Sequence, residues 1–144
     1  MIDRTLVTRK LNLVANDLGE LAMFGDMPLE TYLAERIHAA AAERFLERII
    51  GRMIDVNFHI ITELGHPPPK DYFESFVALG THRVLPHEFA GEIASAAGLR
   101  NRIVHEYDVL DPRLVHQAIG KALRDIPRYI DHVNRFLAAS PTDG

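Results

Sequence analysis

Residues 29–64, LETYLAERIHAAAAERFLERIIGRMIDVNFHIITEL, carry the longest helical pattern in the chain. Apolar side chains recur there at intervals of three and four residues, which places them along one face of an α-helix. These side chains are Leu33, Ile37, Ala41, Phe45, Ile49, Met53, Val56, Ile60 and Leu64. Gly65 and the run 67–69 of three prolines follow, and glycine followed by proline is a strong signal for the end of a helix. The segment predicts one long helix with a buried face.

Helical patterns also flank this segment on both sides. Residues 3–25 repeat apolar side chains with the same spacing, and Gly25 and Asp26 then end the pattern. Residues 71–80 predict a short helix whose inward side chains are Tyr72, Phe76 and Leu79. The chain therefore continues as helices separated by short breaks.

The C-terminal half predicts two more helices. Pro86 can begin a helix that extends toward Tyr107. Asp111 is a suitable N-cap for a last helix, with Pro112 as its first residue. Strand-like alternation is absent from the sequence. We therefore expect an all-α protein, an up-and-down bundle of four to five antiparallel helices.

Length and composition limit the class of protein. The chain has 144 residues, 47% of them hydrophobic, which suits one domain over residues 1–144 with a flexible tail at about 140–144. It has no cysteine, which excludes disulfides, a thiolate nucleophile and cysteine zinc ligands. Neither a signal peptide nor a membrane-spanning run is recognisable. We expect a cytoplasmic protein.

The charge restricts how nucleic acid could bind. The formal net charge is −4, whereas dedicated nucleic-acid-binding proteins are usually basic. Any RNA site must therefore gather basic residues locally, or a dimer must bring two small patches together. The predicted helices are long for so small a domain, and long helices often pair with a second copy. A homodimer is the expected assembly.

One short segment concentrates residues suited to chemistry, GLRNRIVHEY at 98–107. Arg100 and Arg102 offer charged donors that match a phosphate, and His105 can exchange a proton near neutral pH. Tyr107 offers a hydroxyl group and a ring for stacking. A solvated, cationic helix end would produce the same composition. On an ideal helix Arg100 and His105 also point about 140° apart, so one chain alone would not bring them together easily.

Other kinds of site find little support. The sequence contains no GxxxxGK[ST] loop, no GxGxxG after a strand and no HExxH. Eight histidines are present, but their spacings do not suit a metal site. We expect neither a metal nor a cofactor bound to this chain.

The spacing Arg100-x4-His105-x-Tyr107 resembles the Rx4HxY signature of HepT-type toxins in the HEPN superfamily, with Asn101 at the polar position after the arginine. The resemblance extends to the long second helix and the proline-rich break, so it covers most of the chain. It implies a metal-independent ribonuclease that cleaves tRNA or mRNA by attack of the 2′-hydroxyl group. Arg100 and His105 would be catalytic, supported by Asn101, Arg102 and Tyr107. The active cleft would form between two protomers, which answers the geometric objection.

The resemblance also implies a partner and a form of control. HepT-type toxins accompany a minimal nucleotidyltransferase antitoxin, in a type VII-like toxin–antitoxin pair. The antitoxin uses ATP to transfer AMP onto the tyrosine of the motif, here Tyr107. The added nucleotide would block a cleft intended for RNA phosphates.

Alternatives remain open. The motif could belong to a non-catalytic nucleotide-binding protein that serves as the partner and substrate of a nucleotidyltransferase, or to a purely structural helical module.

Arg44, Arg48 and Arg52 recur every four residues and could bind RNA as a phosphate track. The simpler and favoured interpretation of this row is a solvated face paired with Glu43 and Glu47.

Overall fold

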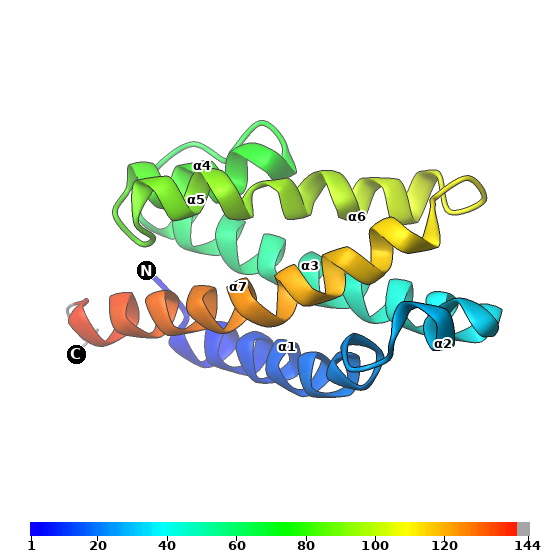
Figure 1. Ribbon diagram of the computed structural model, residues 1–144. Coiled ribbons are helices and arrows are strands. Elements are labelled where there is room, and N and C mark those ends of the chain that lie inside the picture. The colour runs from blue at the N-terminus through cyan, green and yellow to red at the C-terminus, as the bar shows by residue number, and fades with distance from the viewer. Residues whose placement is uncertain (141–144) are drawn as a thin grey trace.

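The computed structural model describes residues 1–140, and most of the predicted tail at 140–144 lies outside that range. Residues 1–140 form helices and contain no strand, and the long helices run back and forth beside one another (Figure 1). The elements are α1 (Arg4–Gly25), α2 (Leu29–Ala34), α3 (Arg36–Glu63), α4 (Tyr72–Thr81), α5 (His87–Ile93), α6 (Ser95–His105) and α7 (Pro112–Ala139). The predicted all-α, up-and-down bundle is confirmed.

The helix α3 lies at the centre of the bundle. It packs against α1, α2, α4, α6 and α7, and its core-facing side chains include Leu46, Ile49, Met53 and Ile60, all fully buried. Gly65, with a φ of 90°, ends the helix where the sequence predicted. Because so many elements rest on α3, it sets the position of the segment that carries the RNRIVHEY motif.

The predicted helix at 29–64 is divided at Glu35, whose backbone is extended (φ −132°, ψ 129°). The expected burial of Leu33 and Ile37 is therefore wrong, since they are 36% and 68% exposed. The extended residue interrupts the helical phase, so that Tyr32 enters the core in place of Leu33. Tyr32 packs there against the ring of His116, with 4.8 Å between centroids.

The helix predicted from Pro86 is also divided. The helices α5 and α6 meet at Ala94 and continue along the upper edge of the bundle in Figure 1. Ala94 keeps a helical backbone, and its N–H donates to the Ala90 carbonyl. The helix ends at His105, so Tyr107 lies in the following turn and outside the helix.

A buried polar network joins three helices. The Tyr129 hydroxyl on α7 lies 2.5 Å from Asn57 Oδ1 and 3.2 Å from the Met53 carbonyl, both on α3. Asn57 Nδ2 donates in turn to Ser75 Oγ on α4 at 3.1 Å. Burial raises the pKa of Tyr129, so its hydroxyl stays protonated as a donor. The network fixes the relative positions of α3, α4 and α7.

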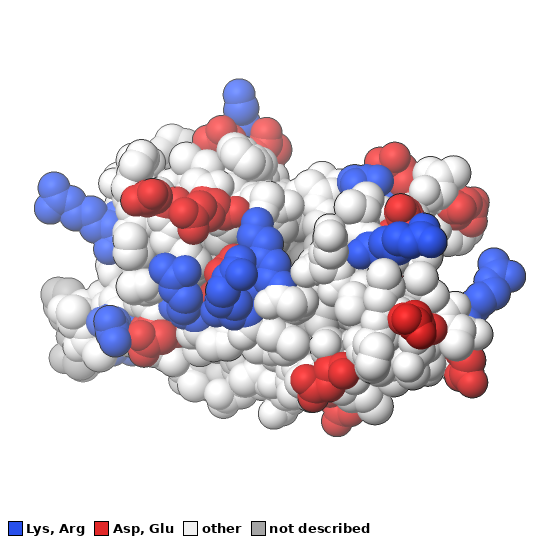
Figure 2. Space-filling model, in the orientation of Figure 1, with Lys and Arg blue, Asp and Glu red and all other residues white. Residues whose placement is uncertain are grey.

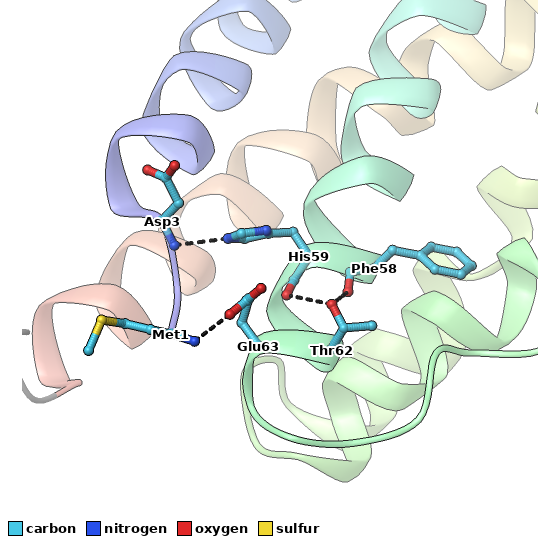
Figure 3. Close-up of polar contacts among 6 residues, drawn as sticks. All are labelled: Met1, Asp3, Phe58, His59, Thr62 and Glu63. Carbon is cyan, nitrogen blue, oxygen red and sulfur yellow. Dashed lines mark hydrogen bonds and ion pairs between the residues drawn. The ribbon is translucent and has the colours of Figure 1, made fainter.

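The N-terminal residues pack against the C-terminal end of α3 (Figure 3). The Met1 ammonium group pairs with Glu63, and the Asp3 N–H donates to His59 Nε2 at 2.9 Å. The Asp3 side chain also caps α1 by accepting from the Leu6 N–H. The hydrogen bond from the ammonium group lowers the pKa of Glu63. These contacts fix the start of α1 against the end of α3.

Charge is distributed unevenly over the surface. Lys and Arg side chains gather over the middle of α7, with acidic side chains beside them (Figure 2). Arg124 and Arg128 of this helix both pair with Asp125, whose carboxylate is buried. None of the described helices combines the length and the apolar character needed to cross a bilayer.

Candidate active site

The motif lies on the last turns of α6 and in the turn that follows. Ala97 and Ile103 are buried and fix which side of α6 faces the core. His105 is two residues beyond Ile103, about 200° around the helix, and therefore points away from the core and is exposed. Arg100 is only about 60° from Ile103 and lies half-buried beside α3. Within one chain, the two predicted catalytic residues face different surroundings.

Arg100 is held against α4 by an aromatic ring. Its guanidinium carbon lies 5.2 Å from the centroid of the Tyr72 ring, within the range of a cation–π contact. One terminal nitrogen lies 3.5 Å from Asn101 Oδ1, and the buried Nε has no hydrogen-bond partner. Tyr72 was predicted to point inward, but it is 39% exposed. The first residue of a short helix lies at the rim, so its ring packs on Arg100 and leaves the core to Phe76 and Leu79.

Arg100 shares a pocket of about 490 Å³ with the arginine row of α3. We call this the arginine pocket. It is lined by Arg44, Glu47, Arg48, Gly51, Arg52, Ile54, Asp55, Phe58, Tyr72 and Arg100. The structure therefore brings together the arginine predicted to be catalytic and the three arginines considered as a possible phosphate track, although they come from different helices.

The ion pairs of this row differ from the sequence interpretation. Arg44 pairs with Glu47 at 3.4 Å, as expected. Arg48 and Arg52 instead pair with Asp17 of α1, at 3.3 Å and 2.6 Å. Asp17 is only 7% exposed, and it was overlooked because it stands inside the apolar stripe of α1, next to Leu18. A carboxylate in such a stripe signals a cationic partner on a neighbouring helix.

Tyr107 faces a second pocket, of about 680 Å³, between the α6–α7 turn and the helices α2 and α3. We call it the tyrosine pocket, and its other lining residues include Tyr32, Arg36, Glu43 and Arg44. Burial raises the pKa of Tyr32 to about 12, with a further contribution from Glu43. Arg44 and Glu47 line both pockets, so the two hollows are neighbours along α3.

The remaining motif residues lie elsewhere. Gly98, Asn101 and His105 fall on one exposed side of α6, because steps of three, four and seven residues return to the same face of a helix. A Cβ atom at Gly98 would meet no atom within 4 Å. Arg102 lines a separate hollow between α6 and α7. His105 lines neither the arginine pocket nor the tyrosine pocket.

The described part of the chain contains no cluster of side chains suited to bind a metal ion. Within residues 1–140, no group of three or more His, Asp or Glu side chains is placed to hold a metal ion. The stacked rings of His66 and His82, 3.7 Å apart, are a pair without a third ligand.

Comparison with known proteins identifies the family that this chain resembles. A family model described as "Ribonuclease HepT-like" matches residues 14–133. The chain is 37% identical over 136 residues to a protein named tRNA nuclease HepT from Aphanizomenon flos-aquae, covering 94% of this chain and 92% of that protein. It is 27% identical over 86 residues to the mRNA nuclease HepT of Shewanella oneidensis, covering 60% of this chain and 65% of that protein.

A solved structure shares the fold at low sequence identity. It is the tri-AMPylated HEPN toxin of Shewanella oneidensis in complex with its MNT antitoxin, with a TM-score of 0.82 and 20% identity. The alignment covers 94% of this chain and 99% of the toxin. Given the family match over residues 14–133 and the 37% identity to a named HepT nuclease, the chain belongs to the HepT-like ribonuclease family.

Proposed function

We propose that this protein is the toxin of a toxin–antitoxin pair and that it cleaves RNA without a metal ion, using Arg100 and His105. The observation that carries the proposal is the place of Arg100, which lies in an arginine-lined pocket of a ribonuclease-family chain. Four guanidinium groups at one hollow suit a phosphodiester substrate better than a neutral one. The proposed place of action is the cytoplasm, where tRNA and mRNA are found.

The proposed reaction is an internal transesterification. The 2′-oxygen of one nucleotide attacks the adjacent phosphorus, and the bond from phosphorus to the 5′-oxygen of the next nucleotide breaks. His105 moves a proton, and Arg100 stabilises the negative charge that builds up on the phosphorane. The products are a 2′,3′-cyclic phosphate and a 5′-hydroxyl end. Asn101, Arg102 and Tyr107 are proposed to support the site.

A homodimer would complete this site. Arg100 and His105 of one chain lie about 140° apart around α6, which is too far for both to reach one phosphate directly. The exposed side that carries His105 also carries Gly98, where open space would let another helix approach closely. We propose that a second protomer packs against this side of α6 with its own arginine pocket, so that His105 of one protomer works with Arg100 of the other.

Regulation is proposed to act through Tyr107. Its side chain is 66% exposed and follows the end of α6, where a partner enzyme can reach the hydroxyl group. The phenolic oxygen would attack the α-phosphorus of ATP held by a cognate nucleotidyltransferase antitoxin, and pyrophosphate would leave. The adduct adds bulk and negative charge beside the arginines. The AMPylated, antitoxin-bound relative supports this assignment.

The substrate is proposed to be tRNA or mRNA, because the two named relatives are a tRNA nuclease and an mRNA nuclease. Both are single RNA strands with exposed loops, in which the 2′-hydroxyl group can align with the phosphorus.

Mixing two inactive variants tests the reaction and the shared cleft together. Purified Arg100→Ala and His105→Ala proteins should each leave RNA intact. After exchange of subunits in an equal mixture, about half of the dimers would be mixed, each with one of its two sites complete, so the mixture should regain about a quarter of the wild-type rate. A wild-type protein that leaves RNA intact would reject the nuclease. Active wild type with an inactive mixture, after subunit exchange has been verified by mass, would reject the two-chain cleft.

A further inference from the structure

We infer that the arginine pocket is a binding subsite for the RNA strand next to the bond that is cleaved. Its arginines would hold a backbone phosphate, and the Tyr72–Phe58 aromatic pair would stack the neighbouring base. This inference rests on the proposed ribonuclease function and specifies where the strand lies along α3.

The charges around the pocket favour an anion. Four arginines and two carboxylates, Glu47 and Asp55, line it. Two further charged groups contact these residues from α1: Lys10 pairs with Asp55 at 3.2 Å, and Asp17 pairs with Arg48 and Arg52. With these included, five cations still face three carboxylates. In a chain of net charge −4, this is a local cationic site of the kind that RNA binding requires.

The arginines keep donors free for a ligand. Each guanidinium carries five N–H groups, and the ion pairs of Arg44, Arg48 and Arg52 use only part of them. Asp17 holds Arg48 and Arg52 in place from the buried side of the row. The Nε of Arg100 is buried without a partner, which is a cost that a bound phosphate or a small shift toward it could relieve.

The aromatic pair supplies a stacking surface beside these charges. Phe58 meets Tyr72 edge to face, with ring centroids 6.3 Å apart at 85°. This contact fixes the Tyr72 ring while leaving it 39% exposed. Aromatic rings next to a cationic groove are the usual means of binding single-stranded nucleic acid without a sequence preference.

The space in the pocket depends on a glycine in the middle of α3. Gly51 lines the pocket, and a Cβ atom there would meet nothing within 4 Å. Glycine in a helix interior costs about 1 kcal/mol relative to alanine, and no close helix packing explains it here. Its small size leaves room between Arg48 and Arg52 for a ligand.

The test measures RNA affinity separately from cleavage. In a His105→Ala background, which removes the proposed turnover, fluorescence anisotropy would follow the binding of a short labelled single-stranded RNA. A Cβ atom at position 51 meets nothing within 4 Å, so Gly51→Glu should place a carboxylate in the open pocket and weaken binding at least roughly tenfold. Tyr72→Ala should weaken it by a similar factor. Arg44→Ala should lower the dependence of log affinity on log salt by about one.

Gly120→Glu is the matched control. Gly120 is an exposed glycine inside α7 with open space around it, so the change alters net charge equally but lies outside the pocket. Its affinity should equal that of the His105→Ala parent. Equal affinities for Gly51→Glu and Gly120→Glu, with both proteins folded by circular dichroism, would overturn the inference even if the wild type cleaves RNA. If Gly51→Glu alone loses affinity while the wild type cleaves nothing, the pocket stands as an RNA-binding site, but the proposed reaction and the place of the pocket beside a cleaved bond both fail.

Discussion

Arg100 is proposed to be catalytic, and it is also one of the residues that line the arginine pocket. Tyr72 lies against its guanidinium group, and α3 contributes three more arginines to the same pocket. His105 occupies the opposite situation, exposed on the outer side of α6. This separation follows directly from their spacing of five residues. The sequence could therefore predict that the two side chains diverge, but not that Arg100 would join the arginine row.

Tyr107→Phe removes only the phenolic oxygen, so it tests the proposed control by AMPylation separately from catalysis. Without the phenolic oxygen, the protein cannot accept AMP, so it should gain no mass after incubation with the cognate nucleotidyltransferase and ATP. The wild-type protein should gain one or more AMP units under the same conditions, as read by intact mass spectrometry. Equal gains in both proteins would place the modification on another residue.

At the scale of elements, the sequence predicted where most helices lie, but not how each helix is interrupted and which of its sides faces the core. The end of α3 at Gly65 and the start of α7 at Pro112 follow from local chemistry that the sequence displays. The break at Glu35 has no glycine or proline to announce it. The break lets Tyr32 pack against His116, a contact with a distant helix that the local sequence does not display. Contacts of this kind override local propensity.

The same reason explains why Asp17 was missed. Its position in the α1 stripe is visible in the sequence, but its partners depend on how α1 and α3 are rotated against each other. Arg48 and Arg52 meet it only because of that rotation. The composition of the arginine pocket likewise depends on the rotation of α6 against α3, which periodicity alone does not fix.

Two glycine substitutions should have opposite effects on stability. A Cβ atom at Gly80 would lie 2.6 Å from the Cβ of Ala90, which cannot move aside by changing rotamer. Gly80→Ala should therefore reduce the free energy of unfolding by about 1–3 kcal/mol. Gly19 in α1 has open space around it, and Gly19→Ala should increase that free energy by about 1 kcal/mol. Urea denaturation of both variants would check this, and a stabilised Gly80→Ala protein would contradict the close approach of α4 and α5.

The contact between His66, just before the three prolines, and His82, at the end of α4, should make the stability of the protein depend on pH. Burial, together with the charge of His66, lowers the pKa of His82 below 6.5, and Lys70 and Glu74 line the same hollow. The unfolded chain therefore binds more protons here, so stability should fall as pH drops through about 6.5. His82→Gln should reduce the loss of urea midpoint between about pH 7.5 and about pH 5.5. His87→Gln, at an exposed histidine, should lose as much as the wild type, and an identical loss in all three proteins would refute the assignment.

At the scale of the whole molecule, an acidic chain is proposed to act on an acidic polymer. The net charge of −4 provides no general attraction for RNA, so binding must depend on local sites. The arginine pocket is such a site, and the exposed side of α6 that carries His105 offers the surface on which a second copy could complete it. The chain belongs to a ribonuclease family, and the local charge and the divergence of Arg100 from His105 are the grounds on which we propose that the site is shared by two copies.

The most direct test of this account compares purified wild-type and His105→Ala proteins on one labelled RNA in the presence of excess EDTA. The wild type should cleave and produce 2′,3′-cyclic phosphate and 5′-hydroxyl ends. The variant should retain the helical circular dichroism spectrum and lose cleavage by at least roughly a hundredfold, the usual contribution of a general acid or base. Intact RNA with the wild type, or equal cleavage by both proteins, would contradict the account.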